Sequence, residues 1–203
     1  PPKPDRRQRQ MCIRDRFITA NELLEDSFLL ASKVLDSGFV PTFIIAIWRG
    51  GAPIGIAMQE FLAFFGVEAN HIAVRTSSYL GIGEQAKQVQ VHGLGWAIKN
   101  LRSTDKLLLV DDVHDTGLSV AELIRQIEIR AGNNTPHEIK FAAPYFKPRQ
   151  SKTSRIPDFY VHETNEWLVF PHELLGLSSA ELEQQKPHIA QLRERLLSRF
   201  DRS

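Results

Sequence analysis

The sequence predicts an α/β fold, and three observations support this prediction. Apolar runs typical of buried strands alternate along the chain with amphipathic helical patterns. The 203 residues, 42% of them hydrophobic, suffice for one well-filled core but are too few for two ordinary domains. Acidic and hydroxylic residues directly follow one of the strand patterns, where open α/β sheets place their ligands.

The elements before this polar segment follow from local patterns. Residues 19–22 (Thr-Ala-Asn-Glu) form a capping box before a helix with one apolar side, and Gly38 is expected to end that helix. Residues 43–48 form the first core strand, and a helix follows it to about Phe65. Residues 87–91 alternate between polar and apolar side chains, which is typical of a strand.

Two further helices are expected near the end of the chain. Residues 178–181 (Ser-Ser-Ala-Glu) resemble a helix cap, and Pro187 can start a last helix. That helix carries an apolar stripe, which packs on its own domain or forms a dimer contact. The stripe consists of Ile189, Leu192, Leu196 and Phe200.

The most informative segment joins the strand pattern of residues 107–110 to a polar loop and an amphipathic helix. Backbone amides at a helix start, with hydroxyl groups beside them, can hold a phosphate monoester without a lysine. Carboxylates at the carboxyl end of a strand can accept hydrogen bonds from vicinal hydroxyls or hold a hydrated Mg²⁺. A helix cap needs one such residue, and this loop has five, so we favour a ligand site. They are Asp111, Asp112, Asp115, Thr116 and Ser119.

Residues 110–119 resemble the phosphoribosyl diphosphate (PRPP) signature of type I phosphoribosyltransferases. In that signature two acidic residues, two variable positions and Asp-Thr-Gly follow a hydrophobic run, and the resemblance covers most of residues 17–175. It implies the type I phosphoribosyltransferase fold, a mainly parallel central sheet flanked by helices, with a small hood over the base site. It also implies transfer of a 5-phosphoribosyl group from PRPP to a purine base.

The resemblance assigns PRPP binding to this signature and to a second loop. Residues 44–53 contain a strand that ends in Arg-Gly-Gly and leads into a helix, like the family's diphosphate loop; an ordinary strand-to-helix turn is the alternative. Paired glycines let backbone amides approach a ligand, and an arginine offsets diphosphate charge. In the family, a non-proline cis peptide often joins the residue pair before the second glycine. The implied PRPP-binding residues are Arg49, Gly50, Gly51, Asp111, Asp112, Asp115, Thr116, Gly117, Leu118 and Ser119.

The acidic residues of the signature have separate implied roles. By the resemblance, Asp115 is the catalytic general base or proton partner at purine N7. Asp111 and Asp112 contact the ribose hydroxyls and the shell of Mg²⁺, which is the implied cofactor. His114 lies at a variable position of the signature, and we interpret it as a packing or solvent-facing residue.

A second resembling segment contains Ser77, Ser78 and Tyr79, which match the mobile loop of the small bacterial xanthine-guanine enzymes. A mobile segment fits the chemistry, because water must be kept from the transition state. Residues 81–86 also fit the loose dinucleotide pattern G-x-G-x-x-A. We reject that interpretation, because these glycines do not directly follow a strand and no helix pattern follows them.

A third resembling segment implies the base site. In purine members of the family, a lysine after the next strand donates to the exocyclic oxygen of a 6-oxopurine, and an aromatic residue further on stacks over the base. Lys147 and Trp167 match these positions, and Leu168 belongs to the same implied base site. Considered separately, Lys147 would be a surface residue and Trp167 a core residue. Phe170 and His172 depart from the xanthine-guanine pattern, so the preferred base stays open.

Composition restricts the setting of the protein. Cys12 is the single cysteine, which excludes an internal disulfide and favours a reducing cytoplasm. No stretch approaches the roughly 20 apolar residues of a membrane span. Residues 1–16 hold six basic and two acidic residues, so the remaining chain has 19 basic and 22 acidic residues, a net charge of −3. A net negative charge on residues 17–203 does not fit a surface that binds nucleic acid.

These features predict three parts of the chain. Residues 1–16 are a disordered tail, a non-native start or an RNA-binding arm, and we assign them no function. Residues 17–175 form the phosphoribosyltransferase domain with its hood, and residues 176–203 form a helical extension. The expected partners are PRPP, a purine base and further copies of the chain in a homodimer or homotetramer, without nucleic acid or membrane.

Two alternatives remain at this point. The chain could be a phosphoribosyltransferase for another base, such as orotate, uracil or adenine, or a PRPP-sensing regulator without catalysis. A regulator would need DNA-binding helices or a basic RNA-binding face. About 18 residues precede the predicted fold, which argues against DNA-binding helices, and the net negative charge of residues 17–203 argues against a basic RNA-binding face. We therefore favour an enzyme over a regulator.

Overall fold

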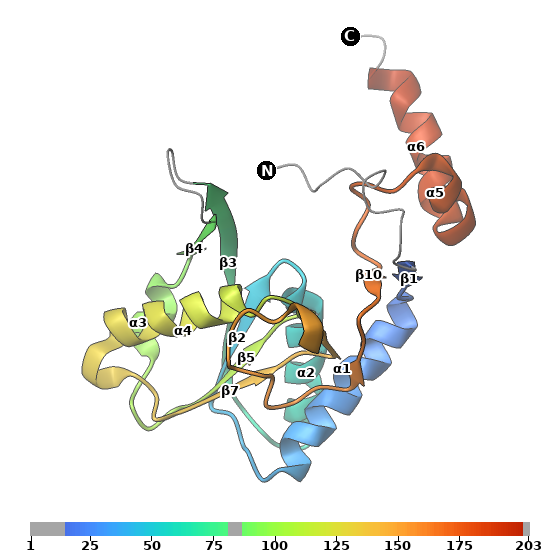
Figure 1. The fold of residues 1–203 in the computed structure, drawn as a ribbon. Helices are drawn as coiled ribbons and strands as arrows, with labels where there is room; N and C mark the ends of the chain where they lie inside the picture. Colours follow the sequence, from blue (N-terminus) through green and yellow to red (C-terminus); the bar gives the residue numbers. More distant parts are fainter. Residues whose placement is uncertain (1–14, 81–86, 201–203) are drawn as a thin grey trace. The chain divides into compact units, whose positions relative to one another are not determined.

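The computed structural model describes residues 15–80 and 87–200. These residues form two compact units: a larger one of residues 20–165, and a smaller one in which residues 15–19 associate with residues 166–200. The larger unit has a mainly parallel sheet flanked by helices (Figure 1), which confirms the predicted α/β fold with its mainly parallel central sheet.

The central sheet of the larger unit has five strands in the order β4-β3-β2-β5-β7. β2, β3, β5 and β7 are parallel, and β4 joins the edge of β3 in the antiparallel direction. β2 and β5 read as nearly continuous apolar runs because helices cover both of their faces. The strands are β2 (Phe43–Trp48), β3 (Asn70–Leu80), β4 (Lys87–His92), β5 (Lys106–Val110) and β7 (Glu138–Ala142).

Alternate side chains of β2 face the two helical layers. Phe43, Ile45 and Ile47 belong to a buried cluster shared with the helices α3 and α4. Ala46 faces the other layer, where its Cβ lies close to Gly55 of α2 and α2 packs against α1. The helices are α1 (Ala20–Asp36), α2 (Gly51–Phe64), α3 (Gly95–Asn100) and α4 (Leu118–Ala131), as predicted for α1, α2 and α4.

A small parallel sheet contains part of the signature segment, residues 110–119, as its first strand. It has the order β6-β8-β9, with β6 at Val113–His114, β8 at Tyr145–Phe146 and β9 at His162–Glu163. Val113 pairs with Tyr145, and Tyr145 pairs in turn with His162. The chain segments that follow β5 and β7 are therefore held in register with each other.

The smaller unit is built from both ends of the chain. β1 (Asp15–Phe17) pairs in parallel with β10 (Trp167–Val169). Helices α5 (Ser179–Gln185) and α6 (Pro187–Phe200) follow. Ser178 forms the expected capping box with Glu181, and α6 begins at the expected proline. The three-part division of the chain and the hood stay predictions.

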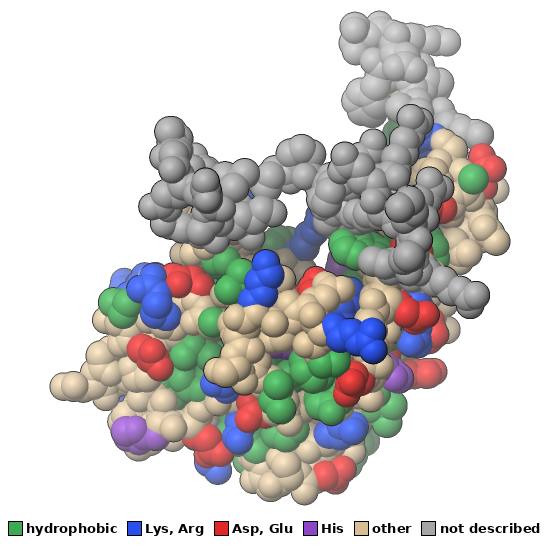
Figure 2. Space-filling model, viewed as in Figure 1, with side chains coloured by type: hydrophobic (Ala, Val, Ile, Leu, Met, Phe, Trp, Pro, Cys, Tyr) green, Lys and Arg blue, Asp and Glu red, His purple; other side chains and the backbone are tan. Residues whose placement is uncertain are grey.

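No helix in the part of the chain that the structure describes is long and apolar enough to cross a membrane. On the side of the larger unit seen in Figure 2, acidic and basic side chains are interspersed with apolar ones.

Candidate functional site

Two loops lie against each other at the carboxyl ends of β2 and β5. A Cβ atom added to Gly51 would overlap the carbonyl oxygen of Val110 and lie 2.8 Å from the Cα of Asp111. A Cβ atom added to Gly50 would overlap the carboxylate of Asp112. Gly51 therefore requires glycine, because a side chain there would meet backbone atoms and force the two loops apart, whereas at Gly50 the Asp112 side chain would have to move.

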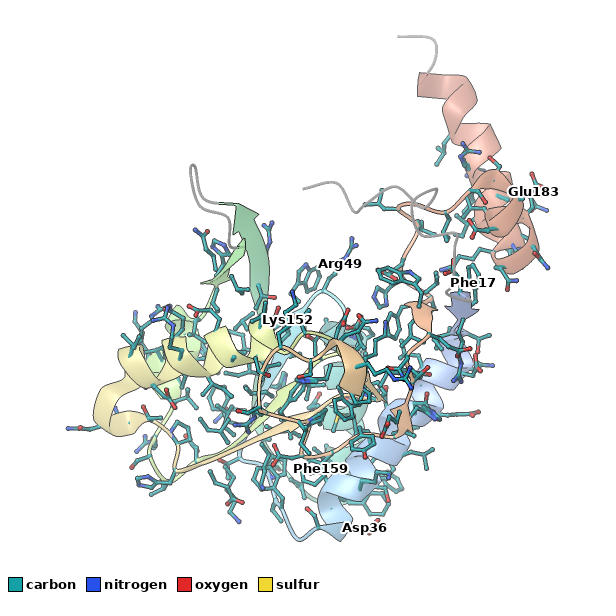
Figure 3. All side chains as sticks on the ribbon, viewed as in Figure 1. Phe17, Asp36, Arg49, Lys152, Phe159 and Glu183 are labelled. Atoms are coloured by element: carbon teal, nitrogen blue, oxygen red, sulfur yellow. The ribbon has the colours of Figure 1, made fainter. Side chains whose placement is uncertain are left out.

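Arg49 occupies the loop that follows β2, at the end of the sheet opposite Asp36, the last residue of α1 (Figure 3). The non-proline cis peptide bond joins Trp48 to Arg49. This is one bond earlier than the position that the family resemblance implied.

The adjacent carboxylates of Asp111 and Asp112 directly follow β5. The pKa of the Asp111 carboxyl is raised well above its usual range, first by burial and then by the negative charge of Asp112. Hydrogen bonds from the backbone amides of Asp112 and Gly51 act in the opposite direction; the first measures 2.9 Å from N to Oδ1. Asp111 therefore links the signature segment to the glycine loop, a contact that sequence reasoning missed.

The turn before α4 presents backbone amides and hydroxyls at the same edge of the sheet. Gly117 has φ +75°, a left-handed conformation that favours glycine, and a Cβ there would also lie 2.8 Å from Cε1 of His114. Thr116 Oγ1 accepts a hydrogen bond from the Leu118 amide at 3.4 Å. The carbonyl of Thr116 accepts one from the Lys152 amide at 2.9 Å, and Figure 3 places Lys152 near this end of the sheet.

Asp115 contacts Gln150 from the 3₁₀ turn Pro148–Gln150. With its amide nitrogen facing Asp115, Gln150 donates to the carboxylate, 3.2 Å from Oδ2. No spacing in the sequence indicated this contact, because the two residues come together only when β6 and β8 pair.

His114 is a packing residue, which is the first of the two interpretations, packing or solvent-facing, that the sequence left open. Its side chain is buried, and its ring centroid lies 5.5 Å from those of Phe141 and Phe146. Burial lowers the pKa of the imidazole. Ser151 Oγ lies 3.5 Å from Nε2, and Nδ1 has no hydrogen-bond partner among the described residues. The buried ring thus packs against the turn at Gly117.

Lys147 lies beside this packed layer. Its backbone amide donates to the carbonyl of His114 at 2.9 Å. The residue is only 3% exposed, so it is not the surface lysine that its chemistry alone would indicate. The structure therefore brings Lys147 and the signature segment together within the larger unit.

The other implied site residues lie on other elements than Lys147 and the signature segment. Trp167 and Leu168 lie on β10 of the smaller unit, where Leu168 is buried and Trp167 partly buried. Ser77 Oγ lies 3.1 Å from His92 Nε2 across the β3–β4 pair.

The implied mobile loop is partly a β ribbon. Backbone pairing of β3 with β4 continues to Leu80 and Lys87, because the alternating residues after 86 pair with β3. The side chains of Ser78 and Tyr79, and the rejected dinucleotide pattern at residues 81–86, lie outside the described residues.

Comparisons with known proteins agree with this architecture. The family model for the phosphoribosyl transferase domain matches residues 19–174. The crystal structure of a purine phosphoribosyltransferase from Pyrococcus horikoshii is similar, with 25% sequence identity and a TM-score of 0.63 over 81% of this chain and 97% of that one. A search of the curated proteins finds no significant match.

Two further solved structures are similar in fold. The xanthine-guanine-hypoxanthine phosphoribosyltransferase of Helicobacter pylori is 18% identical, with a TM-score of 0.58 over 77% of this chain and 92% of that one. A hypothetical protein from Neisseria gonorrhoeae with bound ppGpp is 18% identical, with a TM-score of 0.65 over 82% of this chain and 93% of that one.

Proposed function

The chain belongs to the phosphoribosyl transferase domain family, and on this basis we propose that it transfers the 5-phosphoribosyl group of PRPP to a 6-oxopurine. The products are a nucleoside 5′-monophosphate and diphosphate, and the acceptor is hypoxanthine, guanine or xanthine. The observation that carries the purine assignment is the burial of Lys147, a cationic donor, beside the signature segment. The single cysteine fits a reaction in the cytoplasm.

The PRPP-binding role rests on the two loops at the strand ends. Thr116, Gly117, Leu118 and Ser119 would hold the 5′-phosphate, because the α4 amides and the hydroxyls converge on this turn. The loop of residues 49–51 would hold the diphosphate, with its backbone already in contact with the signature segment. Displacement at the anomeric carbon then needs mainly positioning and electrostatic stabilisation of an oxocarbenium-like state.

The carboxylates supply the remaining groups of the proposed reaction. Asp111 and Asp112 would accept hydrogen bonds from the ribose hydroxyls. Asp115, at the edge of the phosphate turn and held by Gln150, would be the proton partner of purine N7. A carboxylate in this position can take the proton that the incoming base loses.

The donor set fits Mg²⁺. This ion prefers oxygen ligands and is commonly held by one or two carboxylates together with substrate phosphates and waters. Asp111 and Asp112 are adjacent, and their mutual repulsion contributes to the raised pKa of Asp111, which a cation would offset. Among the described residues, no group of three or more His, Cys, Asp or Glu could hold a metal by protein ligands alone. We propose that Mg²⁺ enters with PRPP.

Within the larger unit, Lys147 would recognise the base, and the roles of Trp167 and Leu168 stay predictions from the sequence. An ammonium group only donates hydrogen bonds, so it suits the 6-oxo group of guanine or hypoxanthine and opposes the 6-amino group of adenine. Lys147→Ala should therefore raise KM for the oxopurine by a free-energy equivalent of about 1.5–3 kcal/mol, the scale of a charged hydrogen bond. Initial rates with hypoxanthine, guanine and adenine check this expectation. The ratio of the rate with an oxopurine to the rate with adenine should fall in the variant.

Two variants make this test specific. Lys147→Met keeps most of the buried stem and removes the charge, so it should change base preference like Lys147→Ala with a smaller effect on folding. Lys99→Ala removes an exposed lysine of α3 and should behave like the wild type. An unchanged preference in both Lys147 variants would contradict the purine assignment and leave only the PRPP assignment.

We also propose a homodimer formed through helix α2. Glu60 is the only charged residue of this helix, and Ile56 and Phe64 on its outer side are 66% and 83% exposed. A helix that is apolar on all sides is normally buried. A groove of about 250 Å³ runs between α2 and β3, and its lining includes Ile44, Ala46, Ala52, Ile56, Ile72 and Ala73.

Charges beside the groove favour a second copy of the chain as its occupant. Exposed Glu60 lies on α2, and exposed His71 and Arg75 lie on β3. A two-fold axis would place Glu60 of each copy opposite the basic side chains of the other, so the surface can pair with itself.

A single charge in the groove should separate the two copies. Ile56→Glu should convert the dimer to a monomer in sedimentation-velocity or light-scattering measurements, because it places a charged carboxylate in a mainly apolar groove that the dimer would bury. Ile129→Glu on α4 is the matched control, since Ile129 is 63% exposed and does not line the groove. A monomeric wild type, or a dimeric Ile56→Glu variant, would exclude this interface.

A further inference from the structure

A polar cluster in the larger unit joins buried Asp26 and Tyr145 to His162, whose side chain is 36% exposed. Asp26 of α1 is 7% exposed, and its Oδ2 accepts a hydrogen bond from the Tyr145 hydroxyl at 2.6 Å. Its Oδ1 lies 2.8 Å from Nε2 of His162. Since an ionised carboxylate can only accept, Nε2 of His162 carries the proton of this bond. The Tyr145 and His162 rings also stack, with centroids 5.1 Å apart.

This cluster connects segments that are far apart in the sequence. Asp26 belongs to the first helix of the larger unit, whereas Tyr145 and His162 belong to β8 and β9 and are paired in register. Hydrogen bonds to a charged group are stronger than neutral ones, and burial increases the cost of losing them. The Asp26 carboxylate therefore fixes β8 and β9 against α1.

β8 in turn determines the position of Lys147. Tyr145 and Phe146 form the whole of β8, and Lys147 is the next residue. On its other edge β8 pairs with β6 of the signature segment, and the Lys147 amide donates to the His114 carbonyl at 2.9 Å. A shift of β8 away from α1 would thus displace Lys147 relative to the signature segment.

We propose that Asp26, Tyr145 and His162 are positioning residues for base recognition, which hold β8 so that Lys147 meets the oxo group of the acceptor. The inference rests on the proposed function, because it assigns Lys147 to the base. None of the three side chains is assigned a contact with substrate. Their effect on the reaction passes through the backbone of β8.

Kinetics of Tyr145→Phe test this proposal, because the substitution removes the hydroxyl and keeps the ring and its stacking on His162. It should raise KM for the 6-oxopurine about tenfold, the effect of one lost hydrogen bond to a buried charge, with kcat and KM for PRPP within twofold of the wild type. Asp26→Asn should act in the same direction. The preference for oxopurine over adenine should fall in both variants.

Ser27→Ala is the matched control. Ser27 is the buried neighbour of Asp26 on α1, and its hydroxyl donates to the Leu23 carbonyl at 2.6 Å within the helix. Its loss should lower Tm without changing KM for the base. If Tyr145→Phe and Asp26→Asn also lower Tm and leave base KM and base preference unchanged, the cluster is structural only and the proposal is wrong.

Hydrogen exchange separates this proposal from the proposed function. In Tyr145→Phe the backbone amide of Lys147, which is bonded to His114, should exchange at least about tenfold faster than in Ser27→Ala. Equal exchange in the two variants would overturn the positioning role, even in an active enzyme. A wild type inactive on every purine would refute the proposed function, and the exchange result would still decide whether the cluster holds β8.

Discussion

Replacing Asp115 with asparagine should lower kcat by a factor on the order of 10² or more, the scale of a positioned acid–base group. The side chain keeps its size and can still interact with Gln150, so the turn that precedes α4 should stay intact. Only the ability to take the proton of the base is lost. Steady-state kinetics with saturating PRPP and base measure this loss, and KM for PRPP should change little.

Asp36→Asn is the control for this substitution. Asp36 ends α1 at the opposite end of the sheet from Arg49 (Figure 3), and its variant should keep wild-type kcat. A kcat of Asp115→Asn within a few-fold of the wild type would show that Asp115 has no proton-transfer role.

Adding one methyl group at Gly51 should impair the use of PRPP severely. The new Cβ would meet the carbonyl oxygen of Val110 and the Cα of Asp111, which are backbone atoms and cannot rotate away. The diphosphate loop must therefore shift, and a displacement near 1 Å in a reactive site costs on the order of 10²-fold in rate. We expect kcat/KM for PRPP of Gly51→Ala to fall by about this factor.

Two other glycines make the interpretation specific. Gly50→Ala should have a smaller effect, because its Cβ would meet the Asp112 side chain, which can rotate. Gly95→Ala should leave kinetics unchanged, since no atom lies within 4 Å of a Cβ there. Equal kcat/KM values for PRPP in Gly51→Ala and Gly95→Ala would mean that the contact between the two loops does not support PRPP binding.

The core of the fold was predictable because local patterns determine it. The apolar runs of β2 and β5 and the helical patterns after them indicated buried strands that alternate with helices, and the structure confirms these elements. The pairing of β1 with β10 could not be predicted, because Asp15 and Trp167 are brought together by tertiary structure and no local pattern connects them. The same holds for the two-residue strands of the small sheet.

The sequence suggested the residue types of the candidate site, whose binding role stays a prediction, but few of the contacts among them. The order of residues 110–119 indicated a phosphate and diol site, and the glycine pair indicated a close approach of backbone. The partner in that approach, the end of β5, became visible only in three dimensions. The same applies to Gln150 at Asp115 and to the Asp26–Tyr145 bond, because single side chains at large sequence separations leave no periodic signal.

The most direct test of the central claim is product formation from PRPP with hypoxanthine, guanine, xanthine, adenine, uracil and orotate, each with and without Mg²⁺. Chromatography of the nucleotide, together with an assay for released diphosphate, measures the transfer to each base. We predict a nucleoside 5′-monophosphate and diphosphate in equal amounts from at least one 6-oxopurine, only with Mg²⁺, and little product from adenine, uracil or orotate. Transfer to none of the bases, or transfer to adenine as efficient as to guanine or hypoxanthine, would contradict the proposed function.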